Sequence, residues 1–181
     1  ERILVRKEIN MKFSVNGNSG REYTIKEFNA SENLFSDWGY INIVEYILLK
    51  QHLDAGIKED GIYGNPGEVA DLIQYYYNEA TFLAKNLKNE CIGLITISKD
   101  KKGKTVISSI YVDEPYRNKG IAGSLLFTAI SYLKEHKETS ISISVGDFNK
   151  TAIKFYEKNG FKKDKSTGNK MHVYTLDLKG E

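Results

Sequence analysis

Cysteine is almost absent from the sequence, and histidine is sparse. The single cysteine, Cys91, cannot form an intramolecular disulfide or supply a cysteine-based zinc cluster. It falls in a predicted strand, where we interpret it as a small buried residue and not a nucleophile. The histidines, His52, His136 and His172, are scattered over different elements and indicate neither a metal site nor a Ser-His-Asp triad. We therefore expect no metal cofactor, and a reducing cytoplasm is the simplest location.

A long apolar run is missing as well. No stretch approaches the length of a membrane span, and the charged opening of the chain is not that of a signal peptide, so we expect no membrane partner. The chain begins with Glu1, which indicates a processed or truncated terminus, and Met11 is a second candidate start. With 40% hydrophobic and 28% charged residues among 181, the composition predicts a single globular domain over residues 1–181.

Charge is distributed unevenly along the chain. Residues 31–80 contain nine acids and two bases, a net charge of −7, while the whole chain carries +2 and the remainder therefore +9. This asymmetry argues against a general nucleic-acid binder, which usually presents a uniform basic face. It fits a protein that holds a polyanion on one part and meets a cation on another. The alternative is two unrelated solvated surfaces.

Periodicity predicts a mixed α/β protein without internal repeats or an interdomain linker. Alternating apolar residues between turn residues predict strands at residues 3–15, 22–28, 81–87, 91–98, 105–112, 140–145 and 171–178. Apolar residues at helical spacing predict helices at residues 33–55, 66–78, 122–136 and 150–158. The order is a strand-rich start, two helices, a meander of strands, and then alternating helices and strands.

The most informative stretch joins a predicted strand to the helix that follows it. Helix starts expose unpaired N–H groups and the positive end of the helix dipole, which together favour phosphate. Gly120, Ala122 and Gly123 lack the bulk that would keep phosphate oxygens from these groups, and Arg117 and Lys119 add positive charge. The spacing fits neither the Walker pattern nor the dinucleotide fingerprint. The alternative is that the two glycines only make a tight turn.

Residues 117–122, Arg-Asn-Lys-Gly-Ile-Ala, resemble the Arg/Gln-x-x-Gly-x-Gly/Ala signature of the GNAT N-acetyltransferases. In that family, backbone N–H groups of this loop bind the pyrophosphate of acetyl-CoA. The resemblance implies acetyl-CoA as the co-substrate. The residues that it implies for binding are Arg117, Asn118, Lys119, Gly120, Ile121, Ala122, Gly123 and Ser124.

A second stretch, residues 149–161, is similar to the family's Asn-x-x-Ala-x-x-Phe-Tyr-x-x-x-Gly-Phe motif at every specified position. The resemblance implies that Asn149 contacts the pantetheine arm and that Tyr156 is catalytic, protonating the departing CoA thiolate. A phenol with a pKa near ~10 stays protonated at neutral pH and can make this donation. The alternatives are that Asn149 only caps a helix and that Tyr156 only packs. Gly160 suits the end of that helix in the left-handed conformation.

The resemblance covers residues 81–161, and the element order of the whole chain agrees with it. It implies a GNAT-type mixed, mainly antiparallel central sheet flanked by helices. In this fold the strand before the loop and the strand after its helix splay apart, and acetyl-CoA lies between them. Ile110, Tyr111 and Val112 would then offer backbone groups to pantetheine, and an N–H there would polarise the thioester carbonyl.

The general base is not evident in the sequence. Many family members carry a glutamate on the strand that corresponds to residues 105–112, and this strand contains no acidic residue. Glu90, Asp113 or Glu114 could serve, or bulk water could take the proton. The doubtful base leaves open a second class of function, a module that binds acyl-CoA and senses it without catalysis.

The acceptor side of such a fold corresponds to residues 31–80, the segment of net charge −7. We therefore expect a cationic acceptor, which is a small-molecule amine, a lysine or a peptide N-terminus, attacking acetyl-CoA directly in a ternary complex. Aromatic residues that could line its pocket, with core packing as the alternative, are Trp38, Tyr40, Tyr63, Tyr75, Tyr76 and Tyr77. A toxin that acetylates aminoacyl-tRNA is a third, less favoured interpretation. The acyl length and the oligomeric state, including a homodimer, stay open.

Overall fold

The part of the chain that the computed structural model describes comprises residues 11–14, 22–27, 80–164 and 170–179. The predicted acceptor segment at 31–80, with its two helices and its aromatic residues, lies outside the described residues except for Ala80. Of the strand predicted at residues 3–15, only Met11–Ser14 is described. The expectations for these segments remain predictions.

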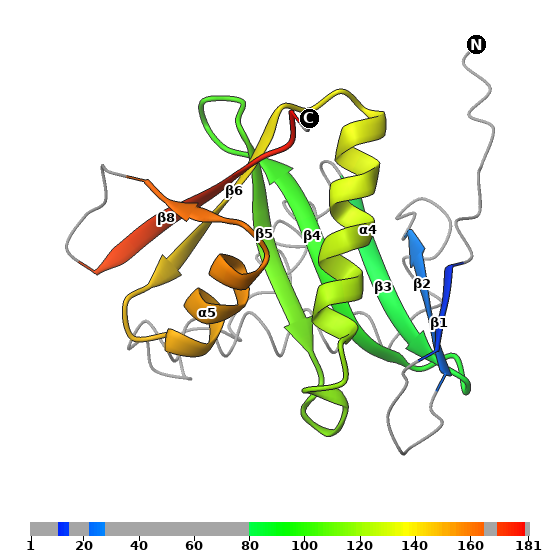
Figure 1. The fold of residues 1–181 in the computed structure, drawn as a ribbon. Helices are drawn as coiled ribbons and strands as arrows, with labels where there is room; N and C mark the ends of the chain where they lie inside the picture. Colours follow the sequence, from blue (N-terminus) through cyan, green and yellow to red (C-terminus); the bar gives the residue numbers. More distant parts are fainter. Residues whose placement is uncertain (1–10, 15–21, 28–79, 165–169, 180–181) are drawn as a thin grey trace, which may run out of the picture.

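The described strands form one sheet, flanked by two α-helices. Its order is β1-β2-β3-β4-β5-β6-β8-β7 (Figure 1). The strands are Met11–Ser14 (β1), Glu22–Glu27 (β2), Ala80–Asn86 (β3), Cys91–Lys99 (β4), Thr105–Val112 (β5), Ser140–Gly146 (β6), Lys162–Lys163 (β7) and Met171–Asp177 (β8). The helices Ile121–Glu135 (α4) and Lys150–Lys158 (α5) both lie in front of the sheet in Figure 1.

The sheet is mixed and mainly antiparallel, as predicted. Every described pair of neighbouring strands is antiparallel except β5 and β6. Those two run parallel and share one paired position, Val106 with Ser142. Both strands continue beyond this pair, β5 to Val112 and β6 to Gly146, and Figure 1 shows them diverging. We call this unpaired stretch the β5–β6 fork. It is the splay that the resemblance implied.

The apolar face of α4 packs onto the strands that precede it. Apolar residues at helical spacing predict one inward face for this helix; of these residues Leu125, Leu126, Ala129 and Leu133 are buried, and Ile130 is partly buried. Burying one leucine side chain stabilises the fold by about 1.5–3 kcal/mol. The position of α4, and with it the loop at its start, is therefore fixed by the core.

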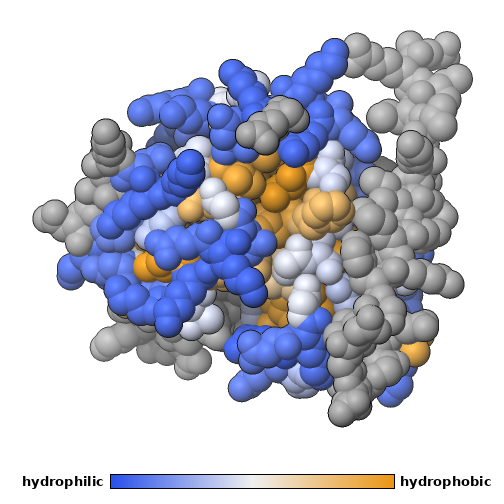
Figure 2. All heavy atoms as spheres, in the orientation of Figure 1, coloured by the Kyte–Doolittle hydropathy of each residue, from blue (hydrophilic) through white to orange (hydrophobic). Residues whose placement is uncertain are grey.

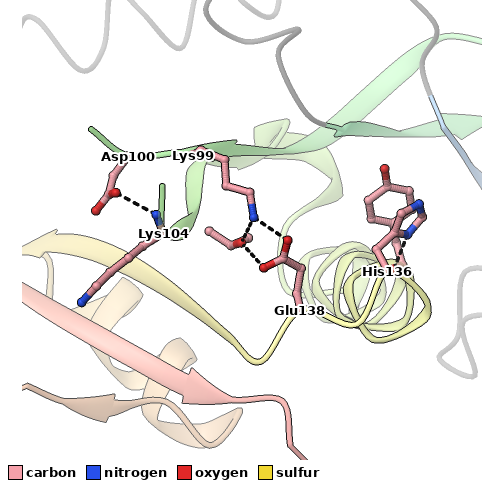
Figure 3. Close-up of polar contacts among 7 residues, drawn as sticks. Lys99, Asp100, Lys104, His136 and Glu138 are labelled. Atoms are coloured by element: carbon pink, nitrogen blue, oxygen red, sulfur yellow. Dashed lines mark hydrogen bonds and ion pairs between the residues drawn. The ribbon is translucent and has the colours of Figure 1, made fainter. Parts of the chain in front are cut away.

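Three polar side chains tie the closed end of the fork together. Lys99 at the end of β4 bonds to Glu138 and, at 2.6 Å, to the Thr105 hydroxyl at the start of β5 (Figure 3). Thr105 in turn donates to Glu138 at 2.7 Å, and Glu138 lies in the loop between α4 and β6. Because Thr105 directly precedes the paired Val106, the Lys99–Thr105–Glu138 cluster holds β5 and β6 together where they meet.

Some element bounds differ from the prediction. α4 begins one residue early, at Ile121, because its N-cap is Gly120 in the left-handed conformation (φ 80°). The turn after β5 contains a 3₁₀ helix, Glu114–Tyr116 (η2), and the two-residue strand β7 was not predicted at all. Within the described residues, no helix has the length and apolar character needed to cross a membrane.

Candidate active site

Residues 113–123 connect β5 to the first turn of α4 at the open end of the fork, and we call this segment the corner. Asp113 caps η2, since its carboxylate accepts from the Glu114 N–H at 2.9 Å, and Pro115 suits the first turn because it needs no N–H partner. The chain then turns back through residues 117–120 into α4. The corner is therefore built from local sequence signals and held to the end of a core strand.

Several N–H groups of the corner have no acceptor among the described residues. The first helical bond of α4 is made by the Ser124 N–H to Gly120 O, at 3.0 Å. The N–H groups of Ile121, Ala122 and Gly123 precede that bond, and the N-cap Gly120 has no side chain to satisfy them. With the positive end of the helix dipole at the same point, the corner favours an anion.

The two glycines of the corner are there for different reasons. Gly120 has φ 80°, a conformation that other residues adopt at a cost, so a tight turn explains it. Gly123 lies inside the first turn of α4, and no neighbouring atom of the described part of the chain lies within 4 Å of where its Cβ would be. Glycine within a helix costs up to about 1 kcal/mol relative to alanine. Neither backbone conformation nor packing requires Gly123, whereas a ligand approaching the helix start would.

The two cationic side chains of the corner brace it. Arg117 Nε donates to Val112 O at 2.9 Å, and its guanidinium lies 5.6 Å from the centre of the Tyr111 ring. Lys119 Nζ donates to Pro115 O at 2.8 Å. Both side chains therefore hold the corner against β5 and η2 while keeping their positive charge beside the helix start. The sequence predicted the charge, and the bracing is an addition from the structure.

The inner edge of β5 faces the fork. Its other edge is paired with β4 through Val112, whereas on the β6 side the pairing stops at Val106. Backbone groups of the segment Ile110–Val112 that point toward the fork thus have no strand partner in the described part of the chain. Figure 2 shows hydrophobic residues at the surface in the strip between α5 and α4. The three residues predicted for pantetheine binding lie at this edge.

Asn149 acts as a helix cap. It is the N-cap of α5, and its Oδ1 accepts from the Ala152 N–H at 3.1 Å. The helix ends at Lys158 with Asn159 as its C-cap, and Gly160 follows with a φ of 88°, the left-handed conformation predicted for it. The capping alternative for Asn149 is therefore confirmed, and contact with pantetheine, for which its amide nitrogen remains, is still a prediction.

Tyr156 lies on the buried face of the same helix. Its side chain is 3% exposed, and its ring makes edge-on contacts with Phe155 and Phe161, each at 5.3 Å between centroids. Burial raises the pKa of the Tyr156 phenol above its ordinary value, so the hydroxyl keeps its proton well beyond neutral pH. No described group bonds to this hydroxyl. The ring thus packs, as the alternative proposed, and the hydroxyl stays a candidate proton donor.

The family follows from comparison with known proteins. Residues 44–161 match the profile described as the Acetyltransferase (GNAT) family, which is more than half of the chain. The chain belongs to this family. This match confirms the resemblance drawn from the two motifs, and it ends at residue 161, where the second motif ends.

The alignments with individual curated relatives span only part of this chain. Streptothricin acetyltransferase A of Bacillus subtilis (strain 168) is 37% identical over 75 residues, which is 41% of this chain and 43% of that protein. The curated relatives that this chain matches are covered over 27% to 50% of their lengths. The alignments therefore span about half of these relatives or less.

Solved structures show that the fold is shared. A GNAT-family acetyltransferase from Staphylococcus aureus Mu50 has a TM-score of 0.64 at 24% identity, covering 87% of this chain and 99% of that chain. The PaiA N-acetyltransferase of Thermoplasma acidophilum, whose crystal structure contains coenzyme A, has a TM-score of 0.63 at 19% identity, with 86% and 98% covered. The GNAT fold is thus confirmed over most of the chain.

The carboxylates suggested as the general base surround the corner of this GNAT domain, and none lies in β5. Glu90 is exposed in the β3–β4 turn and accepts from Asn86 Nδ2 at 2.6 Å. Asp113 is committed to capping η2, and Glu114 is exposed at the start of that 3₁₀ turn. Two of the three thus have a local structural role.

One residue of the site was missed by the sequence analysis. The Tyr23 hydroxyl lies 2.7 Å from Ser124 Oγ, although 101 residues separate the two in the chain. The period of two along a strand puts Tyr23 and Ile25 on one face of β2, and both are buried. No local pattern could show that this strand reaches the start of α4, because that contact depends on how β2 pairs with β3.

The cysteine and the two histidines that the structure describes lie in different elements. Cys91 is partly exposed at the start of β4, so it is less buried than predicted. His136 Nδ1 lies 2.8 Å from Tyr132 O at the end of α4, and His172 lies in β8. Within the described residues, no group of three or more His, Cys, Asp or Glu side chains is placed to hold a metal ion.

Proposed function

We propose that the protein transfers the acetyl group of acetyl-CoA to a primary amine by direct attack in a ternary complex. The observation that carries the proposal is the placement of the corner. The start of α4, with the N–H groups of Ile121–Gly123, lies where β5 leads to the open end of the fork. A pyrophosphate at the helix start and an extended arm along β5 would use both features.

The corner supplies the binding energy for the nucleotide half. A hydrogen bond from a backbone N–H to a charged phosphate oxygen contributes about 1.5–3 kcal/mol, and the corner offers several together. Arg117 and Lys119, fixed by their bonds to Val112 O and Pro115 O, add positive charge without needing to be ordered on binding. Asn118 (φ 59°) and Gly120 (φ 80°) shape the turn that presents these groups.

The chemistry needs a polarised carbonyl and an acid. In our proposal a backbone N–H of Ile110–Val112 donates to the thioester oxygen, which becomes an oxyanion as the amine attacks. The tetrahedral intermediate then breaks its C–S bond, and Tyr156 donates its proton to the departing thiolate. Burial raises the pKa of the Tyr156 phenol, so its proton is present at neutral pH. The same shift makes the phenol a weaker acid, so the donation depends on the hydroxyl being placed against the departing sulfur. The proton of the amine goes to a nearby carboxylate or to water.

The acceptor is proposed to be a cationic amine. The support is the net charge of −7 over residues 31–80, in the part of the chain that precedes the meander. A relative named streptothricin acetyltransferase A makes streptothricin one candidate, alongside small polyamines, lysine peptides and peptide N-termini. The alignment covers less than half of that relative, so its substrate is a starting point for screening.

The proposal is tested by calorimetry and turnover on the full chain. Acetyl-CoA should bind, and thioester should be consumed when the right amine of such a panel is added, in proportion to acetylated product. Binding without turnover over a broad panel would favour the acyl-CoA sensor instead. Turnover confined to aminoacyl-tRNA would favour the toxin. Failure of a folded sample to bind acetyl-CoA or CoA would overturn the proposal.

A further inference from the structure

Three aliphatic hydroxyls lie in α4, and one of them bonds differently from the others. Thr128 donates to Ser124 O at 2.9 Å, and Ser131 donates to Phe127 O at 3.0 Å, which is the usual bond of such residues to the preceding helical turn. Ser124 Oγ is instead 2.7 Å from the Tyr23 hydroxyl, in a different element. The direction of the Ser124 side chain is therefore determined by a partner outside the helix.

That partner is rigidly held. Tyr23 is 4% exposed and belongs to the hydrophobic core, and its strand β2 pairs with β3 so that Tyr23 lies opposite Asn86. A buried aromatic ring has few accessible orientations, so the position of its hydroxyl is set by packing. The bond to Ser124 thus fixes a side chain at the start of α4 relative to the sheet.

The Cα–Cβ bond of Ser124 is directed toward the corner. Side chains of a helix tilt toward its N-terminus, and Ser124 is the fourth residue of α4, so its Cβ points toward the turn at Gly120. Phosphate oxygens only accept hydrogen bonds, whereas a serine hydroxyl can accept one bond and donate another. If Tyr23 donates to Ser124, the serine proton remains available for an anion, and each bond strengthens the other.

We propose that Tyr23 is a positioning residue for the acetyl-CoA site. Its hydroxyl donates to Ser124 Oγ and thereby orients the Ser124 hydroxyl to donate to the pyrophosphate. This inference rests on the proposed function, because it assumes that the anion at the corner is the pyrophosphate of acetyl-CoA. It adds to that function a residue from β2, a strand outside both sequence motifs.

The experiment compares Tyr23→Phe, Ser124→Ala and the double variant with the wild type. Tyr23→Phe keeps the buried ring and removes one hydroxyl. We expect it to raise the KM for acetyl-CoA and the Kd for CoA by about threefold to tenfold, the worth of one hydrogen bond, with kcat unchanged. Because Tyr23 acts through Ser124, the double variant should bind no more weakly than Ser124→Ala alone.

A donor without pyrophosphate separates positioning from general structure. S-acetylpantetheine carries the same thioester and arm, so Tyr23→Phe should use it with the wild-type kcat/KM. Ser131→Ala is the matched control, because it removes a hydroxyl from the same helix whose one bond within the described residues is to Phe127 O. It should leave both donors unaffected. Thermal unfolding of every variant checks the fold, and Ser124→Ala alone tests the serine if Tyr23→Phe does not fold.

The outcomes distinguish this inference from the function on which it rests. If the wild type does not bind CoA, the proposed function fails. If the wild type binds CoA and Tyr23→Phe binds it equally well, the positioning role is excluded and the function stands. Equal losses with acetyl-CoA and S-acetylpantetheine would also overturn the inference, because they would show a structural effect. Additive losses in the double variant would show that Tyr23 does not act through Ser124.

Discussion

At the scale of single residues, the most telling feature is a glycine that the fold does not need. Gly120 is explained by its φ of 80°, whereas Gly123 has helical conformation and open space at its Cβ position. A helix would be more stable with alanine there. A glycine that leaves open space at a helix start and lowers the stability of the fold is typical of a binding site, because functional residues often lower stability.

Gly123→Ala should therefore change stability and binding in opposite directions. We expect the free energy of unfolding to rise by up to about 1 kcal/mol, because alanine is the better helix former. The affinity for CoA should fall by on the order of tenfold or more, because the methyl group tilts toward the helix start where phosphate oxygens would approach. Urea unfolding and calorimetry measure the two effects. A variant that is more stable and binds CoA normally would show that the glycine serves no ligand.

Tyr156 separates packing from chemistry within one side chain. Its ring is buried against Phe155 and Phe161, and its hydroxyl has no bond to any described group. Tyr156→Phe should keep the fold and the CoA affinity while kcat falls about 10²-fold or more, the usual contribution of a general acid. Steady-state kinetics with the identified amine and calorimetry with CoA check this. Unchanged turnover would leave Tyr156 with packing alone.

At the scale of elements, local signals predicted what local sequence controls. The bounds of β5 and α5 were predicted to the residue, since turn residues flank them and apolar spacing runs through them. β7, with two residues, is too short for any alternation to appear. The contact between β2 and the start of α4 could not be predicted, because it joins segments about a hundred residues apart through the pairing of strands.

The closed end of the fork offers a test at this scale. The hydrogen bonds from Lys99 and from Thr105 lower the pKa of the Glu138 carboxyl below its ordinary value. A lowered folded-state pKa means that the carboxylate stabilises the fold above the unfolded pKa, and that this contribution is lost as the pH falls through the folded value. Glu138→Gln should therefore lower the free energy of unfolding by about 0.5–1 kcal/mol near neutral pH, the range of partly exposed pairs.

The difference in the free energy of unfolding between the wild type and Glu138→Gln should shrink as the pH falls below about 4, where a carboxyl in the unfolded chain is protonated. Urea unfolding from pH 7 to pH 3 measures it. Glu135→Gln is the matched control, because Glu135 is exposed in the last turn of α4 with no ion pair recorded in the described residues. A difference in the free energy of unfolding that stays constant with pH would show that the Lys99–Thr105–Glu138 cluster acts through packing and not through the charge of Glu138.

At the scale of the whole molecule, the protein carries positive charge where acetyl-CoA is proposed to bind and negative charge in the segment proposed for the amine. The corner places Arg117 and Lys119 at the start of α4, and the acidic residues are concentrated in the segment at 31–80. The positive corner is a sequence motif, so its residues can be read from the sequence directly. The acidic segment is only a bias in composition, so it indicates that the acceptor is positively charged without identifying the residues that contact it.

Removing acidic charge from that segment should affect one substrate only. In a variant with Glu59→Gln, Asp60→Asn and Glu68→Gln, we expect the KM for the cationic amine to rise on the order of tenfold, because the segment no longer concentrates cations. The effect should weaken as salt is added, since screening already reduces the attraction in the wild type. The KM for acetyl-CoA should not change, because its site is on the corner. If the amine KM is the same in this variant as in the wild type and responds equally to salt in both proteins, the acidic segment is only a solvated surface, and the acceptor must be recognised by shape and hydrogen bonds.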